Sequence, residues 1–150
     1  MQIADNEFIG KKIKIVDMVN GDGQSVSFDD LIGKPAVIYF WASWCKPCHK
    51  TLVVLDKIGP EHNKDMSIVI VSLDDEIQQA KKVLSTLNIT ADSWFAIQGS
   101  IHLNQQDFGN TKRMLPYALL IDEEAMIKAT DIRFRDQQQT QALLNKLKRI

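Results

Sequence analysis

The chain has 150 residues, the length of one ordinary domain, and 45% of them are hydrophobic and 25% charged. This composition provides enough apolar material for a core, and it excludes a disordered tail, a collagen-like fibre and a disulfide-stapled mini-protein. With 18 basic and 19 acidic residues the net charge is −1, so no nucleic-acid or anionic-membrane partner is expected. No apolar run is long enough to predict a transmembrane segment.

The N-terminal segment is predicted to form a β-hairpin followed by one helical turn. Residues 12–19 alternate, though imperfectly, between apolar and polar side chains, which is typical of an edge strand. The sequence Asn-Gly-Asp-Gly at 20–23 predicts a turn, and Val26 and Phe28 fit a short return strand. The helical turn is expected over 28–32.

The centre of the chain predicts a strand–helix–strand unit. Segments 36–42 and 66–73 are mostly apolar, as in strands covered on both faces. A helix over about 45–59 separates them, so the two strands are expected to be parallel, with a right-handed crossover. Asp74 and Asp75 are predicted to cap the next helix. The apolar stripe of that helix repeats at helical spacing through Ile77, Ala80, Leu84 and Leu87.

The rest of the chain is predicted to contribute shorter elements and a closing helix. A short strand is expected at 94–97 and a short helix at 101–108. A buried strand at 117–121 should turn back into 126–129 as a hairpin. The closing helix is expected over 136–149, with its basic residues at the end that the helix dipole favours.

The only two cysteines, Cys45 and Cys48, are the candidate reactive groups. The loop between them is too short for an effective structural staple. They lie where the strand predicted at 36–42 gives way to a helix, and the unpaired N–H groups of a helix N-terminus stabilise thiolate over thiol. Lys46 adds positive charge beside them, and Pro47 is tolerated in a first helical turn.

The two sulfurs are expected to differ in exposure. The helical stripe that starts at Cys48 continues through Leu52, Leu55 and Gly59. Cys48 should therefore face the core, whereas Cys45 lies at the helix tip, within reach of a partner. This asymmetry suits a two-step exchange in which Cys45 attacks a partner disulfide and Cys48 then resolves the mixed disulfide.

The sequence FWASWCKPC at 40–48 resembles the thioredoxin superfamily, and more narrowly the TlpA/ResA-like thiol-disulfide oxidoreductases. Leu115 and Pro116 precede a predicted strand, as in that family, where this proline is cis and lies beside the cysteines. The resemblance implies the same for Pro116, and the backbone next to it would offer an extended partner polypeptide a docking edge. The residues expected to bind substrate or to tune the redox centre are Trp44, Lys46, Pro47, Leu115 and Pro116.

The resemblance covers roughly 28–150 and implies an α/β, thioredoxin-like three-layer fold. A central mixed β-sheet would be flanked by helices, and the predicted hairpin would be an N-terminal extension of the kind found in the TlpA-like branch. No internal repeat or linker divides the chain. One domain over 1–150 is therefore expected, with the extension at 1–27 and the thioredoxin core at 28–150.

The resemblance also implies a function and a location. The chain would be a monomeric reductant that exchanges disulfides with partner proteins and takes electrons from an upstream donor, with no cofactor or metal beyond the Cys45–Cys48 disulfide. The branch works outside the bacterial cytoplasm, which implies a periplasmic location, and cytochrome c maturation is one family role. Residues 1–10 show no signal-peptide pattern, so the protein is either cytoplasmic or a form whose leader or lipid anchor has been removed.

Three positions depart from the family pattern. Tyr39 stands where thioredoxins carry a buried aspartate, and Thr51 stands where TlpA-like proteins often carry a glutamate. In those families the acids help to move the proton of the buried thiol, so water or another side chain would have to serve here. Ala125 replaces the usual glycine in the turn that follows Asp122.

Other functions for the cysteine pair are weighed against this one. Structural zinc needs about four ligands, and no second C-x-x-C or paired-histidine motif exists. A redox-inactive or copper-handling binding module with this fold remains the alternative function. A peroxidase of the peroxiredoxin group would need proline at Ile38 and threonine or serine at Ala42, and it is set aside for that reason.

The remaining tryptophans and histidines are assigned mainly structural positions. Trp41 and Trp94 are expected to pack in the interior, while Trp44 either contacts partners or is simply exposed. Solvated surface positions are expected for His49, His62 and His102.

Overall fold

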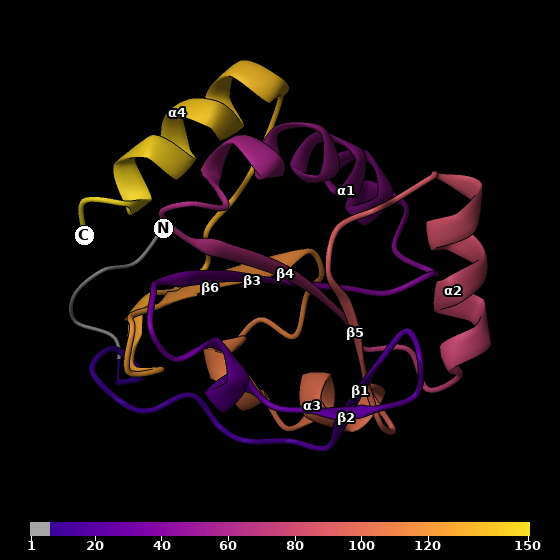
Figure 1. The fold of residues 1–150 in the computed structure, drawn as a ribbon. Helices are drawn as coiled ribbons and strands as arrows, with labels where there is room; N and C mark the ends of the chain where they lie inside the picture. The colour runs from indigo at the N-terminus through magenta and orange to yellow at the C-terminus, as the bar shows by residue number, and fades with distance from the viewer. Residues whose placement is uncertain (1–6) are drawn as a thin grey trace.

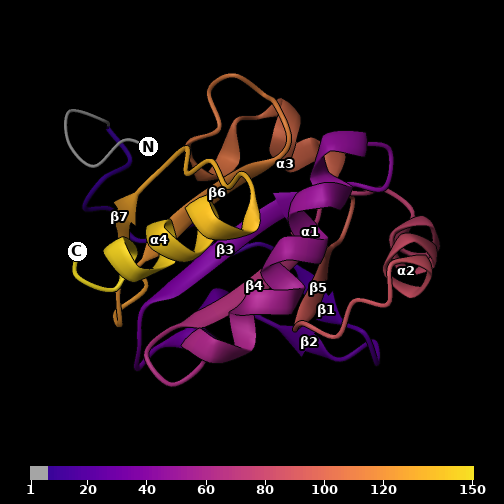
Figure 2. The ribbon, with the colours of Figure 1, turned by 90° about the horizontal axis from the view of Figure 1, so that it is seen from above.

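The computed structural model describes residues 7–150, which form a mixed sheet with helices on both faces (Figures 1 and 2). The strands are β1 (Met18–Asn20), β2 (Ser25–Val26), β3 (Ala36–Trp41), β4 (Ser67–Ser72), β5 (Ser93–Ala96), β6 (Tyr117–Ile121) and β7 (Ile127–Ala129). The helices are α1 (Lys46–Ile58), α2 (Ile77–Thr86), α3 (Ser100–Asn104) and α4 (Gln137–Leu147), with 3₁₀ turns at Phe28–Leu31, Gly59–His62 and Asp107–Gly109. The strand order is β2-β1-β5-β4-β3-β6-β7, and the arrangement confirms the predicted thioredoxin-like α/β fold.

Strand β3 is the centre of the sheet and is buried along its whole length. It pairs in parallel with β4 and antiparallel with β6, which confirms the predicted strand–helix–strand unit around α1. Because side chains alternate along a strand, Val37, Tyr39 and Trp41 pack on the face covered by α1, α2 and α4. Ile38 and Phe40 pack on the opposite face, below which α3 lies in Figure 1.

Aromatic side chains fill the face of the sheet opposite α1. The Phe40 and Phe108 rings stack with centroids 4.5 Å apart, and Phe28 packs edge-on against Phe108 at 5.8 Å. Trp94 and Tyr117 lie in the same cluster. This packing joins the 3₁₀ turn Phe28–Leu31, which follows the N-terminal extension, to the 100–110 region that contains Phe108.

The edge strand predicted at 12–19 is wrong in extent and in place. Only Met18–Asn20 forms a strand, and β1 lies inside the sheet between β2 and β5. The residues before β1 form backbone hydrogen bonds at the opposite edge of the sheet, beside the β6–β7 turn. There the Ile13 N–H donates to the Ala125 carbonyl at 2.9 Å. The chain therefore crosses the sheet between these edges and buries Ile13 and Val16 against it. Apolar alternation does not distinguish such a crossing segment from a strand.

Two backbone conformations shape the loops on either side of β6. The helix predicted at 101–108 is split into α3 and a 3₁₀ turn, because Gln106 and Phe108 have positive φ angles of 57° and 68°. The β6–β7 hairpin is confirmed, and its turn closes with the Ala125 N–H donating to the Asp122 carbonyl at 3.0 Å. Ala125 has φ 65°, which explains why glycine suits this position in related sequences.

The N-terminal predictions are only partly covered by the described residues. Residues 1–6 lie outside the described part of the chain. The segment 1–10, for which no signal-peptide pattern was predicted, and the extension at 1–27 are therefore described only in part. Within 7–150 the helices are all too short and too polar to cross a membrane.

Candidate active site

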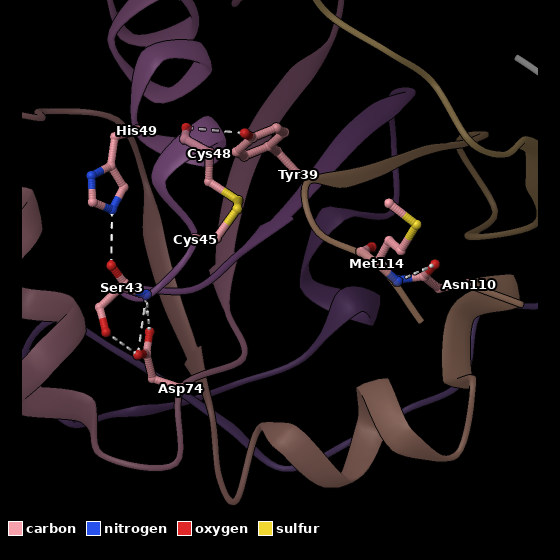
Figure 3. Close-up of a disulfide and its surroundings, with 8 residues drawn as sticks. All are labelled: Tyr39, Ser43, Cys45, Cys48, His49, Asp74, Asn110 and Met114. Atoms are coloured by element: carbon pink, nitrogen blue, oxygen red, sulfur yellow. Dashed lines mark hydrogen bonds between the residues drawn. A yellow bond between two sulfur atoms is a disulfide. The ribbon is translucent and has the colours of Figure 1, made fainter. Parts of the chain in front are cut away.

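The two cysteines lie where β3 ends and α1 begins (Figure 3). Cys45 is the N-cap residue of α1, Cys48 lies in the first turn, and the two form a disulfide with Cα atoms 5.4 Å apart. Pro47 occupies the first turn, where its missing N–H leaves no hydrogen bond unmade. No acidic residue lies in that turn, so the positive end of the helix and the exposed Lys46 provide a positive environment at the tip of α1, where Cys45 lies.

Cys45 is less exposed than the sequence predicts. Its exposed fraction is 5%, against 0% for Cys48. Cys45 is the more exposed of the two cysteines, as expected. The difference in exposure is small because the disulfide turns the Cys45 sulfur toward Cys48 and the α1 core. The neighbouring Trp44 is 61% exposed, so a large apolar side chain lies on the surface next to Cys45 in the sequence.

Asp74 anchors the loop that carries the cysteines, although it was predicted to cap the helix that follows it. Its side chain is buried, with 4% of the residue exposed. Its carboxylate accepts hydrogen bonds from the Ser43 N–H at 3.0 and 3.1 Å, from the Ser43 hydroxyl, and from the Ser72 hydroxyl at 2.7 Å. Since β3 and β4 are parallel and adjacent, their carboxyl ends meet at one edge, and this signal could have placed Asp74 beside the β3–α1 loop.

The prediction that Asp74 and Asp75 cap α2 is therefore wrong. The N-cap residue is Glu76, and no side-chain hydrogen bond caps this helix. Asp75 instead accepts hydrogen bonds from the N–H and hydroxyl of Ser100, which lower the pKa of its exposed carboxyl group. Both aspartates tie loops together, because each finds unpaired donors on a neighbouring segment.

Replacing Asp74 with alanine is expected to lower the free energy of unfolding by about 2–4 kcal/mol, because it leaves several buried donors without an acceptor. Urea unfolding followed by circular dichroism measures this loss. The matched control is Asp75→Ala, which removes an exposed carboxylate of similar position and should cost much less. Equal losses in the two variants would contradict the anchoring role of Asp74.

His49 takes part in the same loop and is not a solvated surface residue as predicted. Its Nε2 lies 3.0 Å from the Ser43 carbonyl oxygen (Figure 3). Its ring packs edge-on against Trp41, with ring centroids 6.4 Å apart. Ser43 is thus held from two sides, by Asp74 through its N–H and hydroxyl and by His49 through its carbonyl. The backbone that leads into Cys45 is fixed accordingly.

Tyr39 and Thr51, which replace the acids of related sequences, lie together beneath Cys48. The Tyr39 hydroxyl donates to the Cys48 carbonyl at 3.1 Å and is also hydrogen-bonded to Thr51. Burial raises the pKa of Tyr39 above its usual value, and the bond with Thr51 only partly opposes this shift. Neither side chain is a base at neutral pH, so both hold the first turn of α1 as neutral hydrogen-bonding groups.

The segment before β6 closes the other side of the site. The Leu115–Pro116 peptide is cis, as predicted, and Pro116 is exposed while Leu115 is half-buried. Asn110 holds this segment, because its side-chain amide donates to the Met114 carbonyl at 2.8 Å. Asn110 and Met114 are placed at the site by tertiary structure alone, and no motif in the sequence marks them.

Two histidines expected on the surface are buried or half-buried and have side-chain partners. His62 is 1% exposed, and its Nε2 lies 3.1 Å from the Gln141 side-chain oxygen. The His102 Nδ1 lies 2.9 Å from an Asp107 carboxylate oxygen. Trp41 and Trp94 are buried as predicted. Within residues 7–150, no three His, Cys, Asp or Glu side chains are grouped closely enough to hold a metal ion.

The fold and the site together define a thioredoxin-like thiol-disulfide oxidoreductase: a cysteine pair lies at the N-terminus of the helix after a central strand, and a cis-proline precedes the strand that pairs with the end of that central strand. The chain belongs to the AhpC/TSA family, whose model matches residues 9–142.

Individual relatives agree with this class. The chain is 27% identical to the thiol-disulfide oxidoreductase ResA of Bacillus thuringiensis over 141 residues, which cover 93% of this chain and 78% of that protein. Among solved structures, a thiol:disulfide interchange protein from a Bacteroides species superposes with a TM-score of 0.75 at 22% identity, covering 94% of this chain and 88% of that one. A thiol-disulfide oxidoreductase from Bacteroides fragilis gives 0.75 at 20% identity, covering 91% and 99%. At these identities the structures support the fold.

Proposed function

We propose that this protein reduces disulfides in partner proteins, with Cys45 as the attacking residue and Cys48 as the resolving residue. The observation that carries the proposal is the position of the pair, with Cys45 at the tip of α1 and the fully buried Cys48 in the turn behind it. The helix N-terminus and Lys46 supply the positive environment that a reactive thiolate requires.

The exchange proceeds in two steps once the protein is reduced. The Cys45 thiolate attacks one sulfur of the partner disulfide, forms a mixed disulfide with it, and releases the other partner sulfur as a thiolate that takes up a proton. Cys48 gives up its proton to water, and its thiolate attacks the Cys45 sulfur and releases the second partner sulfur as a thiolate, which takes up a proton. Two electrons have passed to the partner, and the protein is left with the Cys45–Cys48 disulfide seen in the structure. An upstream dithiol donor regenerates the reduced form.

The docking of the partner forms part of the proposal. An extended partner segment would lie along the backbone at Leu115 and Pro116, with Trp44 and Lys46 contacting it near the reacting sulfur. The side chains of Trp44, Lys46 and Pro116 are exposed, which supports this arrangement. The protein would act as a single-domain monomer outside the cytoplasm, with cytochrome c maturation as the candidate process, and would need no bound cofactor or metal.

The reduction potential tests the direction of electron flow. We expect equilibration with dithiothreitol or glutathione redox buffers to give a potential below about −200 mV, on the reducing side of protein disulfide isomerase. Acid quenching, alkylation and mass spectrometry measure the fraction of reduced protein at each buffer ratio. A potential well above that limit would identify an oxidant and reject the reductant role.

A further inference from the structure

A pocket of about 310 Å³ lies next to residues that contact the first turn of α1. It is formed between segments 109–117 and 130–135, and it is also lined by Tyr39 and Thr51. Because Tyr39 donates to the Cys48 carbonyl, the pocket borders the turn of α1 that holds the buried sulfur. Figure 3 shows Tyr39 and Met114, both pocket residues, on the same side of the disulfide.

The charged side chains of this pocket are mostly cationic. Lys112, Arg133 and Arg135 line it and are exposed, and the one carboxylate among the lining residues is Asp131. Arg133 pairs with Asp131 at 3.3 Å, whereas within residues 7–150 no ion pair involves Lys112 or Arg135. The whole chain has a net charge of −1, so the positive excess is a local property of this pocket.

Exposed apolar side chains near the pocket favour a polypeptide as its occupant. Met114 lines the pocket and is 63% exposed, and Trp44 is similarly exposed next to Cys45. Pro116, also a lining residue, is the exposed cis-proline before β6. A polypeptide can contact these apolar groups beside the redox centre and still extend charged side chains into the pocket, whereas a small anion can do only the latter.

We propose that this pocket binds acidic residues that flank the disulfide of the partner protein, so that the enzyme selects acidic polypeptide segments. The inference rests on the proposed function, since it names the partner chemistry of that same site. Arginine and lysine side chains pair well with carboxylates, and a pocket with unpaired cations raises the local concentration of an acidic segment. Lys112 and Arg135 oppose basic segments by like-charge repulsion, while the carboxylate of Asp131, which would attract them, is paired with Arg133.

Peptide disulfides test this selectivity in turnover. Reduced protein is mixed with peptides that contain one internal disulfide flanked on both sides by aspartate, asparagine or lysine. In each reaction the peptide disulfide becomes a dithiol and the protein dithiol becomes a disulfide, which mass spectrometry follows after acid quenching. Each rate is divided by the rate with dithiothreitol, which corrects for the intrinsic reactivity of the peptide. We expect the aspartate peptide to react about tenfold faster than the asparagine peptide, and the difference to shrink at high salt.

A charge-reversed variant and a matched control locate the effect. The test variant changes Lys112, Arg133 and Arg135 of the pocket to glutamate. The control variant changes to glutamate three exposed residues outside the pocket, Lys64, Lys82 and Arg149. Both variants change the net charge by the same amount. We expect the pocket variant alone to lose the preference for the aspartate peptide. Equal effects of the two variants would mean that only overall charge matters and would overturn the pocket assignment.

Equilibrium binding separates this inference from the proposed function. Serine analogues of the peptides cannot react, so their binding to the oxidised protein, followed by isothermal titration calorimetry, depends on docking alone. Tighter binding of the aspartate analogue together with no turnover of any peptide would support the cationic pocket as a site for acidic segments and reject the reductase. Turnover of all peptides at equal normalised rates, with charge-independent binding, would overturn the role of the cationic pocket and leave the reductase standing. If the pocket variant changed only the rate with glutathione disulfide, and none of the rates with the peptides, a polypeptide would be rejected as the occupant of the pocket.

Discussion

Replacing Cys45 with serine is expected to reduce the rate of insulin reduction by dithiothreitol to that of dithiothreitol alone. The hydroxyl of serine is not a thiolate, and no other cysteine in the chain can take its place, because Cys48 is fully buried beneath the α1 tip. The precipitation of the insulin B chain, followed by turbidity, measures the rate.

The control for this variant is Ser43→Ala, which changes a neighbouring hydroxyl but keeps both sulfurs. It removes one of the hydrogen bonds to Asp74 and should retain most of the activity, since the Ser43 N–H still donates to that carboxylate. Full turnover by the Cys45→Ser protein would show that Cys45 is not the nucleophile. The mechanism proposed above would then be wrong.

Replacing Cys48 with serine is expected to trap a covalent complex with the partner. The first step of the exchange needs only Cys45, whereas the second step needs the thiolate of Cys48 to break the mixed disulfide. The complex should therefore persist on a non-reducing gel and separate when dithiothreitol is added. Mass spectrometry of the excised band identifies the partner peptide linked to Cys45.

The double variant Cys45→Ser with Cys48→Ser is the control for trapping, because it cannot form any disulfide. If the Cys48→Ser protein yields the same bands as this double variant, no mixed disulfide forms at Cys45. Adducts at Cys45 that form but disappear without added reductant would instead show that something other than Cys48 resolves them.

The main elements of the fold were predictable because their signals lie in contiguous residues. The apolar run at 36–42 indicated a central strand, and β3 is buried throughout. The stripe that starts at Cys48 indicated the inner face of α1, and its members are buried as expected. Helix α4 likewise follows its pattern, with Asp136 as N-cap accepting a hydrogen bond from the Gln139 N–H.

Several of the errors fall where a residue's partner is distant in sequence. Residues 12–19 alternate like a strand, yet most of them cross the sheet and pack Ile13 and Val16 in the apolar cluster on one of its faces. Aspartate is a common helix-capping residue, but the Asp74 carboxylate instead accepts hydrogen bonds from Ser43, 31 positions earlier. His62 is polar and was placed on the surface, but it packs against α4 and meets Gln141, 79 positions later.

The sequence by itself determined the reactive groups and the main elements that carry them. Period-two and helical patterns report which face of an element is apolar, and the C-x-x-C spacing places two thiols within one helical turn. Only the tertiary structure decided what surrounds those thiols: the Asp74 anchor, the Tyr39–Thr51 pair and the cationic pocket. These contacts depend on strand order and on loop paths, since charged and polar side chains find partners by proximity in space, and proximity is set by the packing of the whole sheet.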